Sequence, residues 1–102
     1  MPLRALVIDP HDNVANLIGE GRKGDLVQCT IQGSEESAEV TLADDIPAYH
    51  KFARVDIPAG QTVLKYGMSI GRATRDIRRG EHVHVHNIES CRGRGDLATR
   101  QA

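Results

Sequence analysis

Three histidines that stand close together near the end of the sequence are its clearest sign of chemistry. His82, His84 and His86 alternate with Val83 and Val85. Every second side chain of a β-strand lies on the same face, so this pattern predicts a strand with its valines toward a core and its imidazoles on the other face. Same-face neighbours lie roughly 7 Å apart at Cα, and two imidazoles can converge on one metal ion whose bonds to nitrogen are about 2.1 Å. The three histidines are therefore candidate metal ligands, and His84 and His86 are candidate catalytic residues.

Two other interpretations of this strand stay open. The imidazoles can form a solvated polar face, or they can act as a general acid or base, because an imidazole titrates at about pH 6.5. Neighbouring imidazoles lower one another's pKa and so favour the neutral form that binds metal. Because three ligands on one straight strand do not converge easily, the spacing supports a partial metal site that a carboxylate or histidine from elsewhere would complete.

Two pairs of residues earlier in the chain suit an anionic ligand. His50 is followed by Lys51, and Lys65 is followed by Tyr66. Lysine ammonium groups near histidines favour the binding of a carboxylate, so these four residues are candidate substrate contacts. The competing interpretation is that both lysines are solvated charges on edge strands and that the tyrosine ring packs against nearby backbone.

The composition narrows the class of protein. The chain has 102 residues, enough for one domain, with 13 Lys and Arg against 14 Asp and Glu, and 3% of its residues are aromatic. Nucleic-acid binders normally carry a basic excess, so that class is excluded. No run of about 18 apolar residues is present, which argues against a transmembrane helix. Cys29 and Cys91 lack the spacing of a disulfide framework or a metal motif, and we expect a cytoplasmic protein with reduced thiols.

Short strands, rather than helices, should carry the candidate residues. Ten glycines and four prolines in so short a chain imply many turns, and β-branched runs lie between them. Residues 3–8 predict a strand that ends in a dense turn signal, where Asp12 and Asn13 favour an Asx-type turn. Residues 14–19 predict either a brief strand or a helical turn.

A β-hairpin is predicted after these elements. Val27, Cys29 and Ile31 alternate with polar side chains over residues 25–32, which is the pattern of a half-buried strand. A polar turn follows, and residues 38–42 form the expected return strand. The fold class predicted from composition and pattern is therefore all-β.

The second half of the chain contains an internal repeat. Residues 53–63 and 73–83 place Ala, Asp, Ile, Gly and Val at the same positions, and a fainter copy begins at Asp45. The repeat predicts an Ile anchored in the core, a tight turn closed by Gly with positive φ, and then a strand. The Asp before each Ile is expected to bond nearby backbone N–H groups and so fix the turn.

Together these features resemble the SAF domain of the altronate and galactarate dehydratase family. The resemblance is carried by Asp12-Asn13-Val14-Ala15, residues 46–53, Asp56-Ile57, Gly60, Lys65-Tyr66-Gly67, residues 70–73 and residues 80–87. It implies one domain over residues 1–88 with a SAF-type β-clip fold of short strands and hairpins. Residues 89–102 hold three Arg and two Gly with almost no apolar periodicity, and we expect a flexible C-terminal tail there.

The chain departs from the family pattern at two positions. Tyr49 stands before His50 and Lys51, where the family usually has Gly, and Asp9 stands near a position where altronate dehydratases carry His. A bulky side chain at residue 49 is expected to alter the loop or to exclude part of a ligand. Because the galactarate branch lacks the histidine-rich strand, the chain is more similar to the altronate and sulfolactate sulfo-lyase branches.

The resemblance implies a small subunit of an altronate-type dehydratase, a carbon–oxygen lyase that converts an anionic hydroxy acid to a 2-keto-3-deoxy acid. Such a reaction needs a base, an electrophile and an acid. Family members are described as dependent on iron or manganese, and a divalent metal can serve as the electrophile. One small β-domain lacks the deep pocket of a full site. The histidines, His84 foremost, are therefore expected to contribute to a metal site shared with a large dehydratase subunit, and the isolated chain is expected to be inactive.

Three alternatives to this function stay open. The chain can be a non-catalytic SAF module that stabilises or regulates a partner enzyme, the small subunit of a sulfolactate sulfo-lyase, or a free-standing metal carrier. A hydroxyl leaving group and a sulfonate leaving group look alike from this subunit. The sequence also leaves open whether the isolated chain forms a homo-oligomer.

Overall fold

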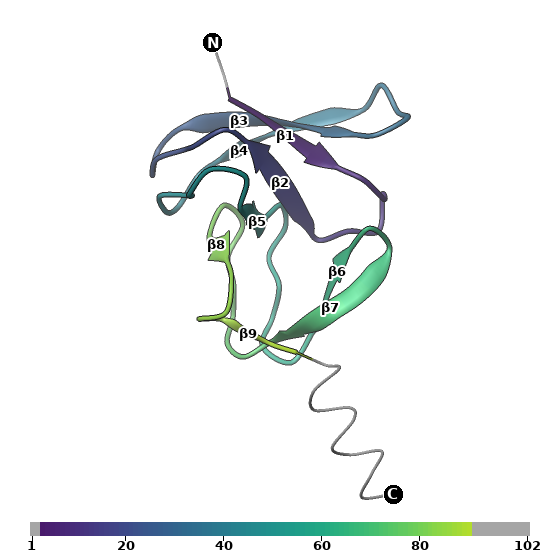
Figure 1. Ribbon diagram of the computed structural model, residues 1–102, viewed down its shortest axis with the longest axis vertical. Helices are drawn as coiled ribbons and strands as arrows, with labels where there is room; N and C mark the ends of the chain where they lie inside the picture. Colours follow the sequence, from purple (N-terminus) through teal and green to yellow (C-terminus); the bar gives the residue numbers. More distant parts are fainter. Residues whose placement is uncertain (1–2, 91–102) are drawn as a thin grey trace, which may run out of the picture.

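The computed structural model describes residues 3–90, and these residues form strands joined by turns, with no helix among them (Figure 1). In chain order the strands of this region are β1 (Leu3–Val7), β2 (Val14–Ile18), β3 (Leu26–Ile31), β4 (Ser37–Thr41), β5 (Lys51–Ala53), β6 (Thr62–Lys65), β7 (Met68–Ala73), β8 (His82–Val83) and β9 (Ile88–Glu89). The predicted all-β, SAF-type fold class is confirmed. A helix that could cross a membrane is absent from residues 3–90.

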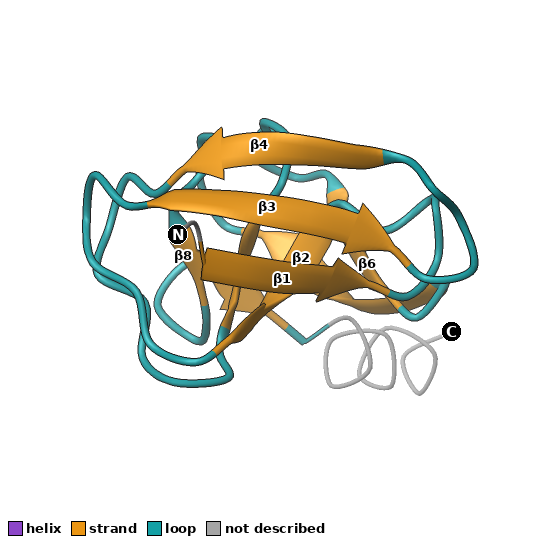
Figure 2. Cartoon of the chain, turned by 90° about the horizontal axis from the view of Figure 1, so that it is seen from above, coloured by secondary structure: helices purple, strands orange, loops and turns teal. Residues whose placement is uncertain are grey.

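Two sheets hold these strands. The first has six strands in the order β4-β3-β1-β2-β5-β8, and all its neighbours are antiparallel except β1 and β3, which are parallel. The second has three antiparallel strands in the order β6-β7-β9. Figure 2 shows β4, β3 and β1 side by side along one side of the domain. The opposite edge of the six-stranded sheet is β8, which carries the first of the clustered histidines.

The strands predicted in the first half are present. β1 covers most of the strand predicted at residues 3–8. Residues 14–18 form a strand and not a helical turn, because they pair with β1 on one side and β5 on the other. β3 and β4 form the predicted antiparallel hairpin. Val27 and Cys29 are buried as the alternation predicts, and Ile31 is partly buried against the same core.

Two hydrophobic cores lie on either side of a wall formed by β2 and β5. Along β2, Val14 belongs to the second core and Ala15 to the first; along β5, Phe52 belongs to the first core and Ala53 to the second. Successive side chains of a strand point to opposite faces, so the same two strands can serve both cores. The first core is completed from β1, β3 and β4, and the second from β6, β7, β8 and the turns that precede them.

The internal repeat forms a pair of interlocked turns. Ile57 and Ile77 exchange backbone hydrogen bonds of 2.7 and 2.8 Å, and both side chains are buried in the second core. Gly60 and Gly80 close the turns with φ of 86° and 91°, as the repeat predicts. Two distant stretches of chain that share one sequence motif thus pack against each other with the same bonds made in both directions.

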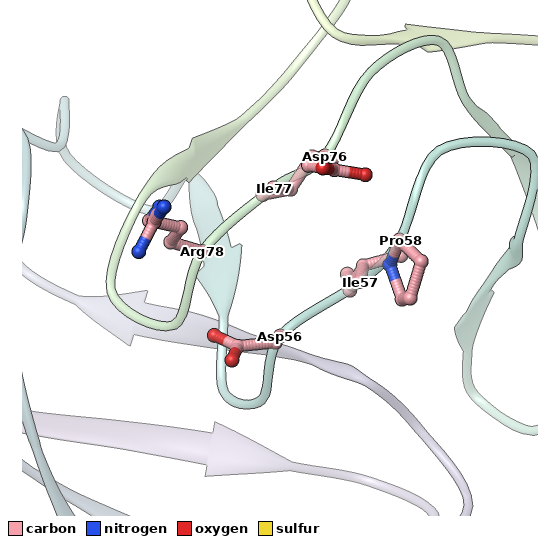
Figure 3. A pocket seen from close by; sticks show the side chains of 6 residues that line it. All are labelled: Asp56, Ile57, Pro58, Asp76, Ile77 and Arg78. Atoms are coloured by element: carbon pink, nitrogen blue, oxygen red, sulfur yellow. The ribbon is translucent and has the colours of Figure 1, made fainter.

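The aspartates of the repeat fix the facing turn. Asp76 accepts the N–H of Ala59, and Asp56 accepts the N–H of Arg79 (2.9 and 2.8 Å). The prediction that each Asp bonds nearby backbone was correct in type, but the bonded backbone belongs to the other copy. An open pocket of about 280 Å³ lies between the two turns (Figure 3), lined by Asp56, Ile57, Pro58, Asp76, Ile77 and Arg78. Because both carboxylates already accept backbone N–H groups, they hold the turns together.

A second pair of turns repeats this arrangement. Residues 45–50, the fainter copy of the repeat, face residues 20–25. The repeat found in the sequence does not include residues 20–25. Gly21 and Ile46 exchange backbone hydrogen bonds of 3.0 and 2.8 Å, as the two isoleucines do in the first pair. Gly24 has φ of 94° and closes its turn in the same way. The four turns therefore form two interlocked pairs.

Tyr49 occupies, in this second pair, the place that glycine takes in the other turns. Its φ is 64°, in the left-handed region that favours glycine. The turn bond from the His50 N–H to the Pro47 carbonyl (3.0 Å) repeats the bond from the Gln61 N–H to the Pro58 carbonyl (3.0 Å). The side chain that departs from the family pattern is therefore held in an unfavourable backbone conformation by the turn around it.

The turn at Asp12 and Asn13 joins the two sheets. Both side chains are buried. The Asp12 carboxylate accepts backbone N–H groups from Asp9, Tyr66 and Gly67 at 2.7 to 3.2 Å, and Asn13 bonds the backbone of β6 through both of its amide atoms. The predicted local turn is thus also a long-range link to the β6–β7 hairpin.

The end of the predicted domain falls inside β9. Ile88 pairs with Ala73 and Glu89 with Arg72 on β7, so the last strand extends one residue past the predicted boundary at residue 88. Residues 91–102 of the tail predicted at residues 89–102, Cys91 among them, lie outside the described residues, and their flexibility stays a prediction.

Candidate metal centre

The histidine-rich segment is a short strand followed by a turn. β8 ends at Val83, and the chain then turns because the buried Asn87 side chain accepts the His84 N–H (3.0 Å) and donates to the His82 carbonyl (2.8 Å). The prediction of one straight strand through all three histidines was therefore wrong. Val83 is fully buried, as expected, but Val85 is 80% exposed at the tip of the turn. The Asn87 side chain thus bonds backbone groups of His82 and His84 that would pair with a neighbouring strand if β8 were longer.

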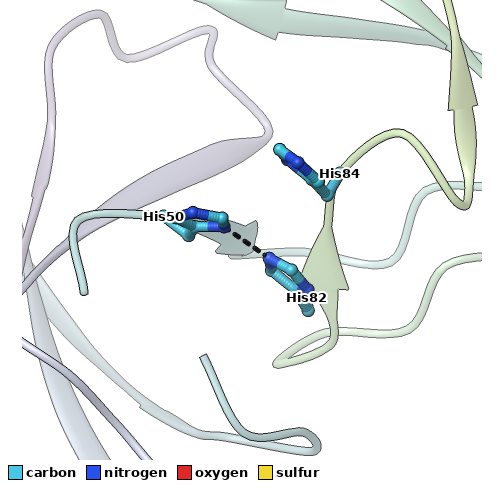
Figure 4. Close-up of side chains that lie close together, drawn as sticks. All are labelled: His50, His82 and His84. Carbon is cyan, nitrogen blue, oxygen red and sulfur yellow. Dashed lines mark hydrogen bonds between the residues drawn. The ribbon is translucent and has the colours of Figure 1, made fainter. Parts of the chain in front are cut away.

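His50 joins this segment from β5. In the β5–β8 ladder Phe52 pairs with His82 and Lys51 with Val83, so one further step brings His50 beside the residue after Val83. The rings of His50 and His84 are indeed 4.8 Å apart, and His50 Nδ1 lies 3.0 Å from His82 Nε2 (Figure 4). A residue predicted as a substrate contact is therefore a member of the histidine cluster.

The cluster has the donor set of a metal site. One ring nitrogen from each of His50, His82 and His84 can be chosen so that all three lie within 4.8 Å of one another. Nitrogens that bind one ion at about 2.1 Å lie roughly 3 to 4 Å apart, so small side-chain adjustments suffice. His86 is exposed, and although its ring is 5.3 Å from that of His82, its nitrogens are not part of this set of three, so it lies at the margin of the cluster. Three imidazoles suit zinc, iron and similar ions and leave positions open for other ligands.

The protonation of the cluster favours metal binding. Burial, then the neighbouring His50, His86 and His84, lower the pKa of His82 to about 4. Burial, then Lys51 and two neighbouring histidines, lower the pKa of His84. Both rings are therefore neutral at neutral pH and keep a lone pair for a cation. The Asp44 carboxylate is occupied by the backbone N–H of His82 (3.0 Å), which fixes the start of β8.

Of the two predicted lysines, Lys51 places positive charge beside the histidine cluster. Lys51 is half-buried, and its pKa is lowered by burial and then by the charge of Lys65. Between residues 3 and 90 the one salt bridge joins His11 to Asp9, so neither lysine is neutralised by a carboxylate there. The Lys51 ammonium group acts on the neutral His84 imidazole through its charge, so this edge of the cluster attracts an anion.

Tyr66 is not brought to the histidines. It lies at the β6–β7 turn with φ of 58°, is 53% exposed, and its ring is 5.0 Å from Lys65 Nζ. Figure 1 places this turn on the far side of β5 from β8. Of the four predicted substrate contacts, the structure thus groups His50 and Lys51 with the histidines, brings Lys65 near enough to Lys51 to lower its pKa, and leaves Tyr66 apart.

Comparison with known proteins agrees with the fold. A family model for the altronate/galactarate dehydratase SAF domain matches residues 3–91. The chain belongs to this SAF-domain family. It is 36% identical over 93 residues to subunit alpha of the (2R)-sulfolactate sulfo-lyase of Chromohalobacter salexigens, a match that covers 90% of this chain and 99% of that subunit.

The SAF domain is also similar to part of a larger enzyme. It is 43% identical over 88 residues to the altronate dehydratase of Escherichia coli K12, a match that covers 86% of this chain and 17% of that protein. It is 38% identical over 64 residues to subunit alpha of the (2R)-sulfolactate sulfo-lyase of Paracoccus pantotrophus, covering 63% of this chain and 96% of that subunit. These relatives are lyases by name, so this SAF domain is of a type associated with lyases.

Proposed function

We propose that this SAF domain is the small subunit of a hydroxy-acid lyase and that its histidines form part of an active site completed by a large subunit. The observation that carries the proposal is the convergence of His50, His82 and His84 at the edge strand of the sheet, with ring nitrogens within 4.8 Å. A cluster on an edge can be covered by another protein. The small size of the domain favours such sharing: three pockets between residues 3 and 90 are open, with volumes of about 280, 200 and 100 Å³, and the clustered histidines line none of these three.

The three clustered imidazoles would hold a divalent metal, with iron or manganese as the family resemblance implies. When bound, such an ion supplies a Lewis acid that stabilises negative charge developing on the substrate carboxylate. The imidazoles of His82 and His84 enter this role without losing a proton, because their lowered pKa values keep them neutral. His86, exposed at the margin, is a candidate to accept or donate a proton at the open side of the site.

The substrate class that fits is an anionic hydroxy acid. Lys51 carries positive charge beside the cluster, Lys65 lies near enough to Lys51 to lower its pKa, and neither has a carboxylate partner in the described chain, so they would bind and orient the substrate carboxylate. Loss of water from such an acid gives a 2-keto-3-deoxy acid. The dehydratase assignment is supported by 43% identity to altronate dehydratase.

A sulfo-lyase is the second candidate. The match to the Chromohalobacter subunit alpha extends over 99% of that subunit, whereas the altronate dehydratase contains much more than the matched region. A sulfonate leaving group would need the same base, electrophile and cationic contacts. The two candidates differ in the bond that is broken and share the site on this chain.

The test is turnover of the complex with the large subunit from the same organism, using altronate and (2R)-sulfolactate. We expect His84→Ala to lower kcat by at least about 100-fold while the complex still assembles in gel filtration. His11→Ala is the matched control, since His11 is exposed and bonds Asp9 away from the cluster. Unchanged turnover of an intact His84→Ala complex would leave the chain as a non-catalytic binding module.

A further inference from the structure

Two strongly exposed apolar side chains flank the histidine cluster. Val85 is 80% exposed and Tyr49 is 74% exposed, more than any other large hydrophobic residue between residues 3 and 90. Tyr49 precedes His50, and Val85 follows His84, and the rings of these two histidines are 4.8 Å apart. Exposed apolar groups on either side of a polar cluster are typical of a surface that another protein covers.

Tyr49 is retained against the preference of its backbone. Its φ is 64°, whereas the corresponding positions of the other three turns are Gly24, Gly60 and Gly80, with φ of 94°, 86° and 91°. A side chain in this region is strained, and a glycine would relieve the strain. Because the Tyr49 ring is exposed, it adds little to the core of this domain. A partner surface that covers the ring would account for a tyrosine at this strained position.

Val85 is presented by a fixed turn. Asn87 is buried, and its side chain bonds the backbone of His82 and His84 at 2.8 and 3.0 Å. A further backbone bond joins the Asn87 N–H to the His84 carbonyl (3.1 Å). A side chain held at the tip of an ordered turn loses little freedom on binding, which favours its use as an anchor.

The charges near these two side chains define the surface that would cover them. Lys51 and Lys65 form no salt bridge within residues 3–90, and the metal-type donor set is made of three imidazoles without a carboxylate. A complementary surface would bring carboxylates to the lysines and to the open side of the cluster, with apolar pockets for Tyr49 and Val85. A large subunit that completes a shared metal site would present such groups, since carboxylates are common ligands of manganese and non-haem iron.

We propose that Tyr49 and Val85 are the anchors of the surface with which this SAF domain docks onto its large lyase subunit, over the histidine cluster. The proposal rests on the proposed function, since it takes the large subunit as the occupant. It places the docking surface and the shared site together, so that assembly closes the site. The altronate dehydratase relative, of which the matched region is 17%, contains further chain that could occupy this position.

The experiment measures the dissociation constant of the full-length chain and its large subunit by calorimetry, for Tyr49→Gly and Val85→Ser. We expect each variant to weaken binding by at least about tenfold. The Tm of the isolated Tyr49→Gly chain should stay equal or rise, because the glycine relieves strain at residue 49. Met68→Ser is the matched control: Met68 is 68% exposed at the β6–β7 hairpin, away from β8, and should leave affinity unchanged.

Four results would overturn the docking surface. Tyr49→Gly and Val85→Ser could bind as tightly as the wild type, Met68→Ser could weaken binding as much as they do, or Tyr49→Gly could lower the Tm, which would make Tyr49 a packing residue. Loss of self-association by the variants, seen by sedimentation with unchanged binding to the large subunit, would also overturn it in favour of a second copy as the occupant. If the wild-type chain neither binds the large subunit nor supports its turnover, the proposed function itself fails.

Discussion

At the scale of single residues, the candidate site depends on one histidine that the local pattern does not group with the others. His82 and His84 are neighbours on one segment, and His50 reaches them only because β5 pairs with β8. His86 stands on the same segment but is exposed within the turn that the Asn87 side chain closes. The geometry therefore favours His50 over His86 as the third ligand.

Metal binding by the isolated chain should discriminate between these two histidines. We expect His50→Ala to weaken binding of Zn²⁺ or Mn²⁺ by about tenfold or more, as loss of a ligand does, and His86→Ala to weaken it by less than about threefold. Equilibrium dialysis with each metal gives the affinities. Equal losses from the two variants would return His86 to the ligand set, and no binding by the wild-type chain would show that the isolated cluster lacks a needed ligand.

The lowered pKa of His82 also predicts a dependence of stability on pH. In the folded chain His82 has a pKa of about 4, below its ordinary value of 6.5. Between about pH 4 and pH 6.5 the unfolded chain therefore binds a proton at His82 that the folded chain does not bind. Stability should be fully present above about pH 6.5 and fall as the pH drops toward 4. In metal-free buffer, the loss of Tm between about pH 7 and pH 5 should be smaller for His82→Gln than for the wild type.

The exposed His11 provides the control for this measurement. His11→Gln should keep the wild-type pH dependence of Tm, because His11 lies outside the cluster on the β1–β2 turn. If His82→Gln has the same loss of Tm as the wild type, another group is responsible for the acid sensitivity.

At the scale of elements, the domain is built from turns that interlock in pairs. Each turn donates and accepts the same backbone bonds as its partner, and an aspartate of one copy caps the other. The strands between the turns are short: of the five described strands within residues 51–89, four have two to four residues and β7 has six. The hydrogen bonds between paired turns therefore determine much of how the chain folds. They also set the register that brings β5 beside β8.

Gly60 and Gly80 occupy matching positions and should respond differently to substitution. Both have positive φ, but a Cβ at Gly60 would enter open space, whereas a Cβ at Gly80 would collide with the backbone carbonyl of Thr41. Gly60→Ala should cost about 1–2 kcal/mol from backbone strain alone, and Gly80→Ala about 3 kcal/mol or more, because backbone must also move. Urea unfolding of the two variants tests this, and equal costs would contradict it.

At the scale of the whole molecule, the two cores share β2 and β5 as a wall, and the Asp12 turn connects the first sheet to the β6–β7 hairpin. A domain of this size buries a modest core, so neither half has much stability to spare. Because β2 and β5 form one wall of each core, neither core is complete without the other. We therefore expect the two cores to unfold together.

The buried thiol of Cys29 can report on this coupling. It lies in the first core, and burial raises its pKa to about 11, so it should react with a thiol reagent only on unfolding. In a Cys91→Ser background, Ile77→Val in the second core should cost about 0.5–1.5 kcal/mol and speed labelling of Cys29 by the corresponding factor. Glu35→Ala, an exposed change at the β3–β4 turn, should leave the rate unchanged. Unchanged labelling in Ile77→Val would mean that the cores open separately.

The sequence by itself determined the all-β class, the β3–β4 hairpin and the chemistry available to the chain. Period-two alternation, glycine-closed turns and a repeated Asp-Ile motif are local signals, and Val27, Cys29, Ile57 and Ile77 are buried as these signals require. The burial predicted for Val85 was wrong, because the same alternation of residues fits a long strand and also a short strand followed by a turn. The turn depends on the side-chain hydrogen bonds of Asn87, which the alternation does not reveal.

Only the tertiary structure decided which residues meet. His50 and His82 are separated by 32 positions, and no local periodicity relates them; the β5–β8 pairing and the interlocked turns on either side bring their nitrogens to 3.0 Å. The same pairing decides that Lys51 lies beside the cluster while Tyr66, bonded through its N–H to Asp12, is held elsewhere. Residue types give the chemistry, and long-range backbone pairing decides which of them can act together.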